Sequence, residues 1–416
     1  MSELSQSQKI NSIRLRWGVL NDSKLDRLRK LGVLCDSKKN LTTSLRMASV
    51  KVALLKVLRK ISGMISPTIK LFQAYLFGLP QKPLILFSHY LTKFPQLETF
   101  ILQLIVLADN EFSKRGIAII GHSLRKLRKL KRLNIELEGR YHISSGVLSS
   151  FARDLNHLQN IMELRFGLKG FSFEGIGITK VFTSLKRLHK LESLHINLST
   201  TYCPGDKGLK GLASSLKKLQ RICSFSLDIE NSPNLEANSM QQFLENLSFL
   251  TNLEFLELNF IRCGVTPLAL TNLSQSLTKL EALKTFKLFL FDNELISSKE
   301  YRELWDSFKR LRKLEELEIR SGSINNLFAI ENEGLRKLGQ IGTLENLKKV
   351  HFTLRGSEEI NDKGLLEFGK GLSQTKSLKA IEIEFMKCDC ISEEGISSLQ
   401  NKLREIPDIS FLKVRN

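Results

Sequence analysis

Along most of the chain, apolar residues recur first every three positions and then every two. Residues 123–137 read SLRKLRKLKRLNIEL, and residues 184–198 read SLKRLHKLESLHINL. A step near three fits the end of a helix and its turn, whereas a step of two fits a strand with one buried face. Both segments therefore predict a helix that runs into a strand, and their similarity indicates a repeat.

Eleven copies of the strand pattern occur at nearly constant spacing. Each copy has the form apolar-x-x-apolar-x-apolar, and the copies begin at Leu97, Leu130, Ile161, Leu191, Ile222, Leu253, Leu283, Leu314, Leu347, Leu378 and Ile409. Successive copies start 30 to 33 residues apart, a register that unrelated strands would not keep. SPTIKL, from Ser66, is a weaker candidate for a further copy. We therefore expect a repeat domain over 65–416, preceded by a separate region over 1–64.

The connections between these strands have helical patterns that begin near a glycine. The seven glycines are Gly116, Gly146, Gly175, Gly208, Gly334, Gly364 and Gly395. Glycine permits a tight entry into a helix and a close approach of the backbone to a neighbour. Three connections have Ser239, Pro267 and Glu300 near the same place, and proline is tolerated in a first helical turn. The chain is thus predicted to be an α/β protein of repeated strand–helix units.

A strand, a loop and a helix every 31 residues resemble the leucine-rich repeat of the ribonuclease-inhibitor-like type, over about 97–416. The resemblance implies a horseshoe-shaped solenoid, with a parallel β-sheet on the concave face, helices on the convex face, and Leu97, Phe100 and Leu102 in the core. The family's usual Asn or Cys just after the strand is replaced by Ile105, Glu138, Lys169, Ser199 and Glu230. The turn after the strand must therefore satisfy its backbone groups in another way.

The concave face is where such solenoids normally bind. Its predicted outward residues include Ile101, Arg165, His195, Asn197, Asp228, Glu257, Lys287, Phe289, Arg320 and His351. The outward positions of all eleven strands carry six acidic and five basic residues, so this face is nearly neutral. That balance argues against a nucleic-acid groove, and the apolar Ile101 and Phe289 beside charged residues favour a protein partner.

Basic residues gather instead in the helix-to-strand turns. We name this set the basic ridge: Arg125, Lys126, Arg128, Lys129, Lys186, Arg187, Lys217, Lys218, Lys309, Arg310, Arg312 and Lys313. Cations near helix C-termini are favoured by about 0.3–1 kcal/mol each, which explains one or two per repeat without any partner. Four per turn exceed that need, so a phosphate-bearing partner is the alternative.

The total charge points to the N-terminal part of the chain. The net charge is +20, and residues 1–96 hold 17 Lys and Arg against 4 Asp and Glu. Such a region suits an acidic partner such as RNA, an anionic membrane surface or an acidic protein face. Within it, residues 41–61 space apolar residues as a helix does, which predicts either a cap on the first repeat or a basic amphipathic anchor.

No pattern in the sequence indicates catalysis. No Gly-x-x-x-x-Gly-Lys-Ser/Thr loop is present, no two histidines are four residues apart, and Cys388-Asp-Cys390 has neither zinc-knuckle spacing nor a second pair. We therefore expect no enzyme activity, no catalytic or metal-binding residue, no cofactor and no small-molecule substrate. Reduced thiols fit an intracellular protein, so we expect a cytoplasmic location, with a mitochondrial one as the alternative.

The last predicted strand lies at the very end of the sequence, at 409–416. An open edge of a parallel sheet is a liability, which Lys413 and Arg415 reduce unless another subunit covers it. The sequence as a whole predicts a non-catalytic scaffold that binds protein within a larger assembly. The alternative is a basic accessory subunit that contacts RNA or another polyanion, and no membrane-spanning segment is expected because no apolar run reaches 18 residues.

Overall fold

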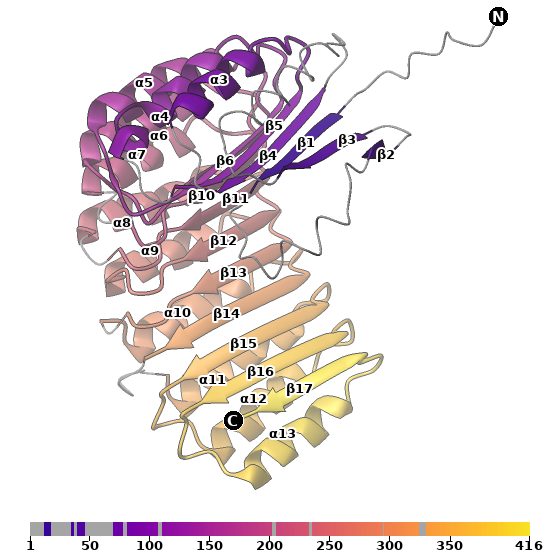
Figure 1. Ribbon diagram of the computed structural model, residues 1–416. Coiled ribbons are helices and arrows are strands. Elements are labelled where there is room, and N and C mark those ends of the chain that lie inside the picture. The colour runs from indigo at the N-terminus through magenta and orange to yellow at the C-terminus, as the bar shows by residue number, and fades with distance from the viewer. Residues whose placement is uncertain are drawn as a thin grey trace, which may run out of the picture. The chain divides into compact units, whose positions relative to one another are not determined.

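The computed structural model describes residues 12–17, 35–36, 40–45, 70–77, 81–106, 110–201, 205–232, 235–293, 295–323 and 330–416. The chain forms two compact units, Met1–Glu192 and Ser193–Asn416. In both units a strand, a loop and a helix alternate along the chain, and the strands of successive repeats pair in parallel (Figure 1). The predicted α/β class and repeat arrangement are thereby confirmed.

The first unit contains a sheet whose strand order is β2-β3-β1-β4-β5-β6-β8. These strands are β1 (Ser12–Trp17), β2 (Cys35–Asp36), β3 (Asn40–Leu45), β4 (Leu71–Phe77), β5 (Thr99–Ile105), β6 (Arg132–Glu138) and β8 (Glu163–Lys169). All neighbours are parallel except β2, which runs antiparallel to β3. The helices are α3 (Gln81–Leu91), α4 (Asn110–Leu124), α5 (Ser145–Leu155) and α6 (Gly175–Leu185), and β7 (His142–Ile143) pairs with β9 (Ser172–Phe173) beside them.

The second unit contains eight parallel strands in sequence order. They are β10 (Ser193–Asn197), β11 (Ser224–Asp228), β12 (Phe255–Asn259), β13 (Thr285–Phe289), β14 (Glu316–Gly322), β15 (Lys349–Arg355), β16 (Ala380–Met386) and β17 (Phe411–Arg415). The helices between them are α7 (Gly205–Leu216), α8 (Ala237–Asn246), α9 (Pro267–Leu277), α10 (Ser298–Phe308), α11 (Asn332–Gly339), α12 (Asp362–Leu372) and α13 (Glu393–Arg404), with short 3-10 helices η1 (Leu247–Phe249) and η2 (Gln340–Thr343).

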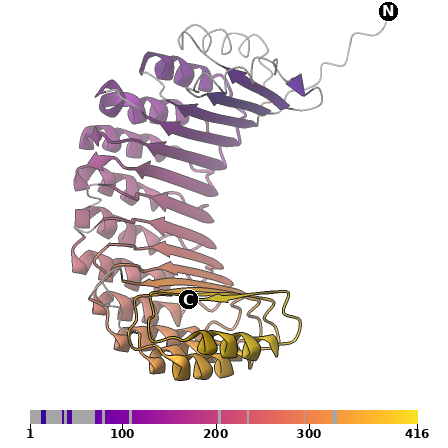
Figure 2. The ribbon, with the colours of Figure 1, turned by 60° about the horizontal axis from the view of Figure 1, so that its bottom comes forward.

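In each unit the helices form one layer and the strands a second layer (Figure 2). The strand residues that face the helices are fully buried: Phe100, Leu102 and Leu133 in the first unit, and Leu256 and Leu288 in the second, are at most 1% exposed. Intervening strand residues, such as Ile101 and Lys287, are only half-buried. They stand on what we call the open face, the side of each sheet that no described helix covers.

Two expectations about the N-terminal part need correction. Residues 41–45 belong to strand β3 and not to the expected helix, while residues 46–61 lie outside the described part of the chain. A further copy of the strand is present as β4, but its register pairs Phe72 with Phe100 and Ala74 with Leu102. This copy of the strand pattern therefore begins three residues after Ser66, the predicted start, because the apolar residues that enter the core are Phe72 and Ala74.

The loop after each strand of the second unit shows how the backbone groups are satisfied. A small polar or thiol side chain lies ten residues after the first apolar residue of the strand pattern in six repeats: Thr201, Ser232, Cys263, Asn293, Ser357 and Cys388. All six are buried. The turn is thus satisfied from deeper in the loop than the positions just after the strand, such as Ser199 and Glu230, and in three repeats the side chain that does so is an Asn or Cys.

Asn293 makes the most complete set of these contacts. Its side-chain amide donates to the carbonyls of Phe260 (2.8 Å) and Leu290 (2.9 Å), and its side-chain oxygen accepts from the amides of Val265 (2.9 Å) and Cys263 (3.3 Å). Asn293 thus joins two successive loops. In five of the six repeats, the residue just before this loop side chain is not glycine and still has a left-handed backbone, as Asp292 does (φ 58°).

Six of the seven predicted glycines lie within the first four residues of their helices, but Gly116 does not, because α4 begins at Asn110. At α12, a Cβ on Gly364 would lie 1.9 Å from the side-chain oxygen of Asn332, so glycine is needed for the close approach; at Gly146 nothing lies within 4 Å. Pro267 is the first residue of α9, and Glu300 closes a capping box with Ser297 at α10. In the described part of the chain, no helix has both the length and the apolarity needed to cross a membrane.

Candidate functional site

The open face of the second unit carries three rows of side chains, because the register pairs equal positions of successive strands. The first row is Ser193, Ser224, Phe255, Thr285, Glu316, Lys349, Ala380 and Phe411. The second row is His195, Ser226, Glu257, Lys287, Glu318, His351, Glu382 and Lys413. The third row is Asn197, Asp228, Asn259, Phe289, Arg320, Thr353, Glu384 and Arg415. Eight of the ten predicted surface residues therefore lie in two adjacent rows.

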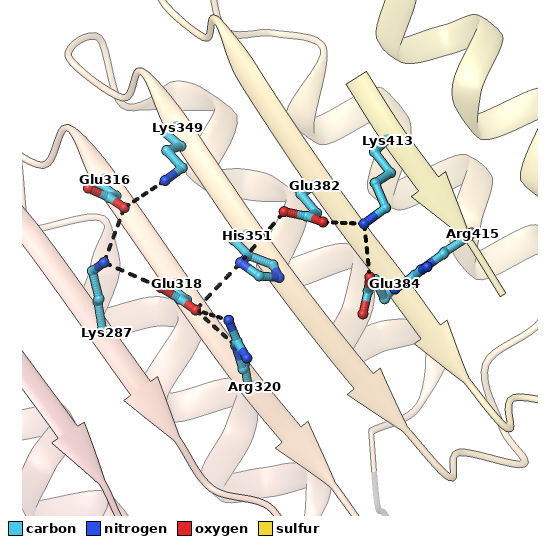
Figure 3. Close-up of polar contacts among 10 residues, drawn as sticks. All are labelled: Lys287, Glu316, Glu318, Arg320, Lys349, His351, Glu382, Glu384, Lys413 and Arg415. Atoms are coloured by element: carbon cyan, nitrogen blue, oxygen red, sulfur yellow. Dashed lines mark hydrogen bonds and ion pairs between the residues drawn. The ribbon is translucent and has the colours of Figure 1, made fainter. Parts of the chain in front are cut away.

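From β13 to β17 the charged side chains pair with one another across the strands (Figure 3). Lys287 reaches Glu316 and Glu318, both at 3.4 Å, and Glu318 also accepts from Arg320 at 2.7 Å. Further along, Lys413 binds Glu382 (2.5 Å) and Glu384 (3.3 Å). This part of the face therefore carries two groups of ion pairs, one around Glu318 and one around Lys413.

Histidine 351 stands between the two groups of ion pairs. Its Nδ1 lies 3.4 Å from Glu318 and 3.9 Å from Glu382. Burial lowers the pKa of His351, although both carboxylates act in the opposite direction. Contact with Lys413 holds the pKa of Glu382 below its ordinary value. The carboxylates here are already matched by neighbouring cations.

An apolar patch lies next to this charged region, at β12 and β13. Phe289 is half-buried on the open face, and the guanidinium of Arg320 lies 5.4 Å from its ring centre. Phe260 and Leu290 directly follow β12 and β13 and are buried, like the inward-facing residues of those strands. The next residues, Ile261 and Phe291, are half-buried and therefore fall on the open side. We define the aromatic patch as Ile261, Phe289 and Phe291. Of these residues, only Phe289 was predicted from the sequence, although the alternation of inward and outward positions continues to residue 291.

Three carboxylates lie near the aromatic patch: Asp228 at the end of β11, Glu230 two residues later, and Glu257 on β12. Asp228, Glu230 and Glu257 form what we call the acidic cluster. Among the described residues, no ion pair involves any of the three. Glu257 accepts only a long hydrogen bond from Ser226 (3.4 Å), and its register neighbour Lys287 binds Glu316 and Glu318 on the other side.

The pKa of Asp228 reflects its burial and its acidic neighbours. Burial raises it to about 6 from 3.8, and the charges of Glu230 and Glu257 act in the same direction. Because the folded pKa lies above the ordinary one, ionisation of Asp228 lowers stability as the pH rises from about 4 to about 6. That cost is fully present at neutral pH. The side chain still accepts a hydrogen bond from the amide of Glu230 at 3.1 Å.

The two predicted residues of the first unit, Ile101 and Arg165, lie on the open face of its own sheet. Ile101 is half-buried in β5, and the register places Asn134 between it and Arg165. Arg165 pairs with Glu163 on its own strand at 3.2 Å. Ile105, at the end of the same strand, is exposed on the same side as Ile101.

All twelve residues of the basic ridge are exposed. The ridge is not continuous within either unit, however, because the turn 156–160 (NHLQN) separates its two clusters in the first unit. There Asn160 donates to the carbonyl of Arg128 (2.9 Å) and accepts from Lys190 (2.7 Å). In the second unit, the turns 248–252 and 278–282 separate the clusters at 217–218 and 309–313.

The cysteines and acidic residues do not form a metal site in the described ranges, where no group of three or more His, Cys, Asp or Glu could hold an ion. Cys388 is buried and lies 3.8 Å from the carbonyl of Leu354, while Cys390 is exposed. The acidic residues of β14 and β16, such as Glu318 and Glu382, are engaged in the ion pairs described above.

These features make the aromatic patch and the acidic cluster the least internally satisfied part of the open face. Known proteins add no further assignment: no protein-family model matches the chain, and a search of the curated proteins found no match.

Proposed function

We propose that the chain is a non-catalytic leucine-rich repeat scaffold of the ribonuclease-inhibitor-like type, which binds a protein partner through the open face of its second unit and is a subunit of a larger assembly. The observation that carries the proposal is the aromatic patch. Aromatic residues beside a fixed arginine, such as Phe289 with Arg320, are typical of the energetically dominant centre of protein interfaces.

The surroundings of the patch support the same function. The ion pairs from β13 to β17 hold their side chains in place, so a partner would lose little side-chain entropy when it binds there. Some of the repeats carry buried Asn or Cys side chains in their loops, and this supports assigning the solenoid to the leucine-rich type. In such solenoids the strand face offers an extended binding surface.

A second function, contact with RNA or another polyanion, is favoured by one observation. The turn 309–313 exposes four basic residues, and only Lys309 has a carboxylate partner among the described residues, at 2.8 Å from Asp306. The interrupted ridge offers several separate phosphate contacts instead of one track. We therefore place this function second.

Affinity purification from cells that express the protein tests the first function. We expect the double variant Phe289→Ser/Phe291→Ser to lose co-purifying proteins at least tenfold, because it removes the apolar centre of the surface. The matched control is Phe249→Ser/Leu268→Ser, which removes two exposed apolar side chains from the helix side. Quantitative mass spectrometry of the purified material measures the difference.

Salt separates the two functions in the same material. A packed protein interface keeps most of its partner between about 50 and 200 mM salt, whereas binding through phosphates falls by orders of magnitude. Equal recovery of partners with both double variants, or loss of all partners by 200 mM salt, would contradict protein binding through this face.

A further inference from the structure

We infer that the partner presents a basic, apolar segment to the second unit, with Lys or Arg side chains against the acidic cluster and an aliphatic or aromatic side chain against the aromatic patch. This inference rests on the proposed function and names the chemistry of its partner.

The first argument is the contrast between two parts of one face. On β14 and β16, the open-face carboxylates are matched by Lys, Arg or His side chains, as Glu316 is by Lys287 and Lys349. On β11 and β12, the carboxylates of the acidic cluster have no such cation in the described part of the chain. Charge complementarity therefore points to a positively charged occupant.

The second argument comes from the neighbours of Asp228 in the third row. Asn197 and Asn259 stand beside it on β10 and β12. Each uses its side-chain oxygen to accept from the backbone amide two residues later, at 3.0 Å from Ser199 and 3.3 Å from Ile261. Asp228 accepts the same bond from Glu230. An amide oxygen therefore suffices for this turn. The other hydrogen-bond partner of Asp228 is the neutral side chain of Asn259, so no cation matches its charge within the described residues.

The third argument is the distance between the two features. Asp228 pairs with Asn259, which pairs with Phe289, so Asp228 and Phe289 are two strands apart. That is about 10 Å at the usual strand spacing, or about three residues of an extended peptide. A short segment can therefore place a basic side chain and an apolar one on this face together.

The positive charge of the rest of the protein restricts the binding of such a segment to the acidic cluster. With a net charge of +20, the chain repels a basic segment in general, so attraction must come from a specific acidic surface. A polyanion is disfavoured here because the acidic cluster would repel it. The segment expected is therefore part of a protein.

A displayed library of random twelve-residue peptides, selected against the full-length chain at 150 mM salt, tests the inference. We expect enriched peptides to carry at least two Lys or Arg together with an aromatic or aliphatic residue. Their binding should weaken at least tenfold in Asp228→Asn/Glu257→Gln, and also in Phe289→Ser. Fluorescence anisotropy with the synthesised peptides measures these changes.

The control Glu281→Gln/Glu345→Gln makes the same change in charge at two exposed turn residues, and it should bind as the unchanged protein does. Asn and Gln at 228 and 257 keep the oxygens that accept the existing hydrogen bonds, so the test variant should fold normally. Peptides without a basic excess that still lose binding in Phe289→Ser would overturn this inference and leave the proposed function standing. No enriched peptide, or none sensitive to Phe289→Ser, would overturn both.

Discussion

Replacing Asn293 by Ala is expected to destabilise the second unit by about 3–4 kcal/mol. The buried side chain makes five hydrogen bonds to the backbone of two successive loops, at Phe260, Cys263, Val265, Leu290 and Phe291. Alanine removes all five and leaves backbone groups unsatisfied where water has little access, at about 1–3 kcal/mol for each group that finds no new partner. The free energy of unfolding in urea, followed by circular dichroism, measures the loss.

Asn252 provides the matched control. Its side-chain amide makes one hydrogen bond, to the carbonyl of Gln220 at 2.9 Å, in an exposed turn. Asn252→Ala should therefore cost less than about 1 kcal/mol, since water replaces the lost partner. Similar losses for the two variants would mean that Asn293 does not hold the loops together.

Gly342→Ala is expected to destabilise the second unit by about 2–3 kcal/mol, the usual range for forcing extra atoms into a well-packed contact. A Cβ at this residue of η2 would lie 2.1 Å from the backbone oxygen of Gly371 in α12. Nearby, a Cβ on Gly339 would lie 2.6 Å from the oxygen of Phe368. The two backbones thus touch directly, and α12 would have to move to admit a methyl group.

The opposite sign is expected for Gly146→Ala, in the first turn of α5. No atom lies within 4 Å of the added Cβ, and alanine is favoured over glycine in a helix by about 0.5–1 kcal/mol. Thermal unfolding of the two variants, compared with the unchanged chain, measures both effects. Stabilisation by Gly342→Ala would show that the close helix contact is not formed.

The repeat could be predicted from the sequence because it depends on periods that burial imposes. A strand with one buried face must alternate, and a constant interval of about 31 residues keeps each apolar residue beside its equivalent, as Leu256 is beside Phe286. The starts of α9 and α10 could also be predicted from the sequence, since Pro267 and Glu300 act on the backbone of their own first helical turns.

The buried loop side chains could not be predicted in the same way. Their interval of ten residues is regular, but the residue type changes from Cys263 to Asn293 to Ser357, because several small polar groups can satisfy a loop carbonyl. Aligning the copies by the strand alone placed the expected residue too early. Structure was needed to show that the loop continues inward after the strand.

In the charged part of the candidate site, the sequence does not show which of several possible partners each side chain binds. Lys287 has acidic neighbours on both sides, Glu257 in β12 and Glu318 in β14, yet it binds the latter and Glu316. That choice separates the acidic cluster from the ion pairs. A count of six acids and five bases therefore predicted a neutral face, whereas the acids without cations gather at β11 and β12.

Site-specific photo-cross-linking tests the central claim most directly. A benzophenone amino acid is placed at Phe289 on the open face, or at Leu268 on α9, where the side chain is exposed on the helix side. After irradiation in the cells that express the protein, we predict a cross-linked protein partner from position 289 and none from position 268. Cross-links from position 268 alone, or cross-links only to RNA, would contradict the account.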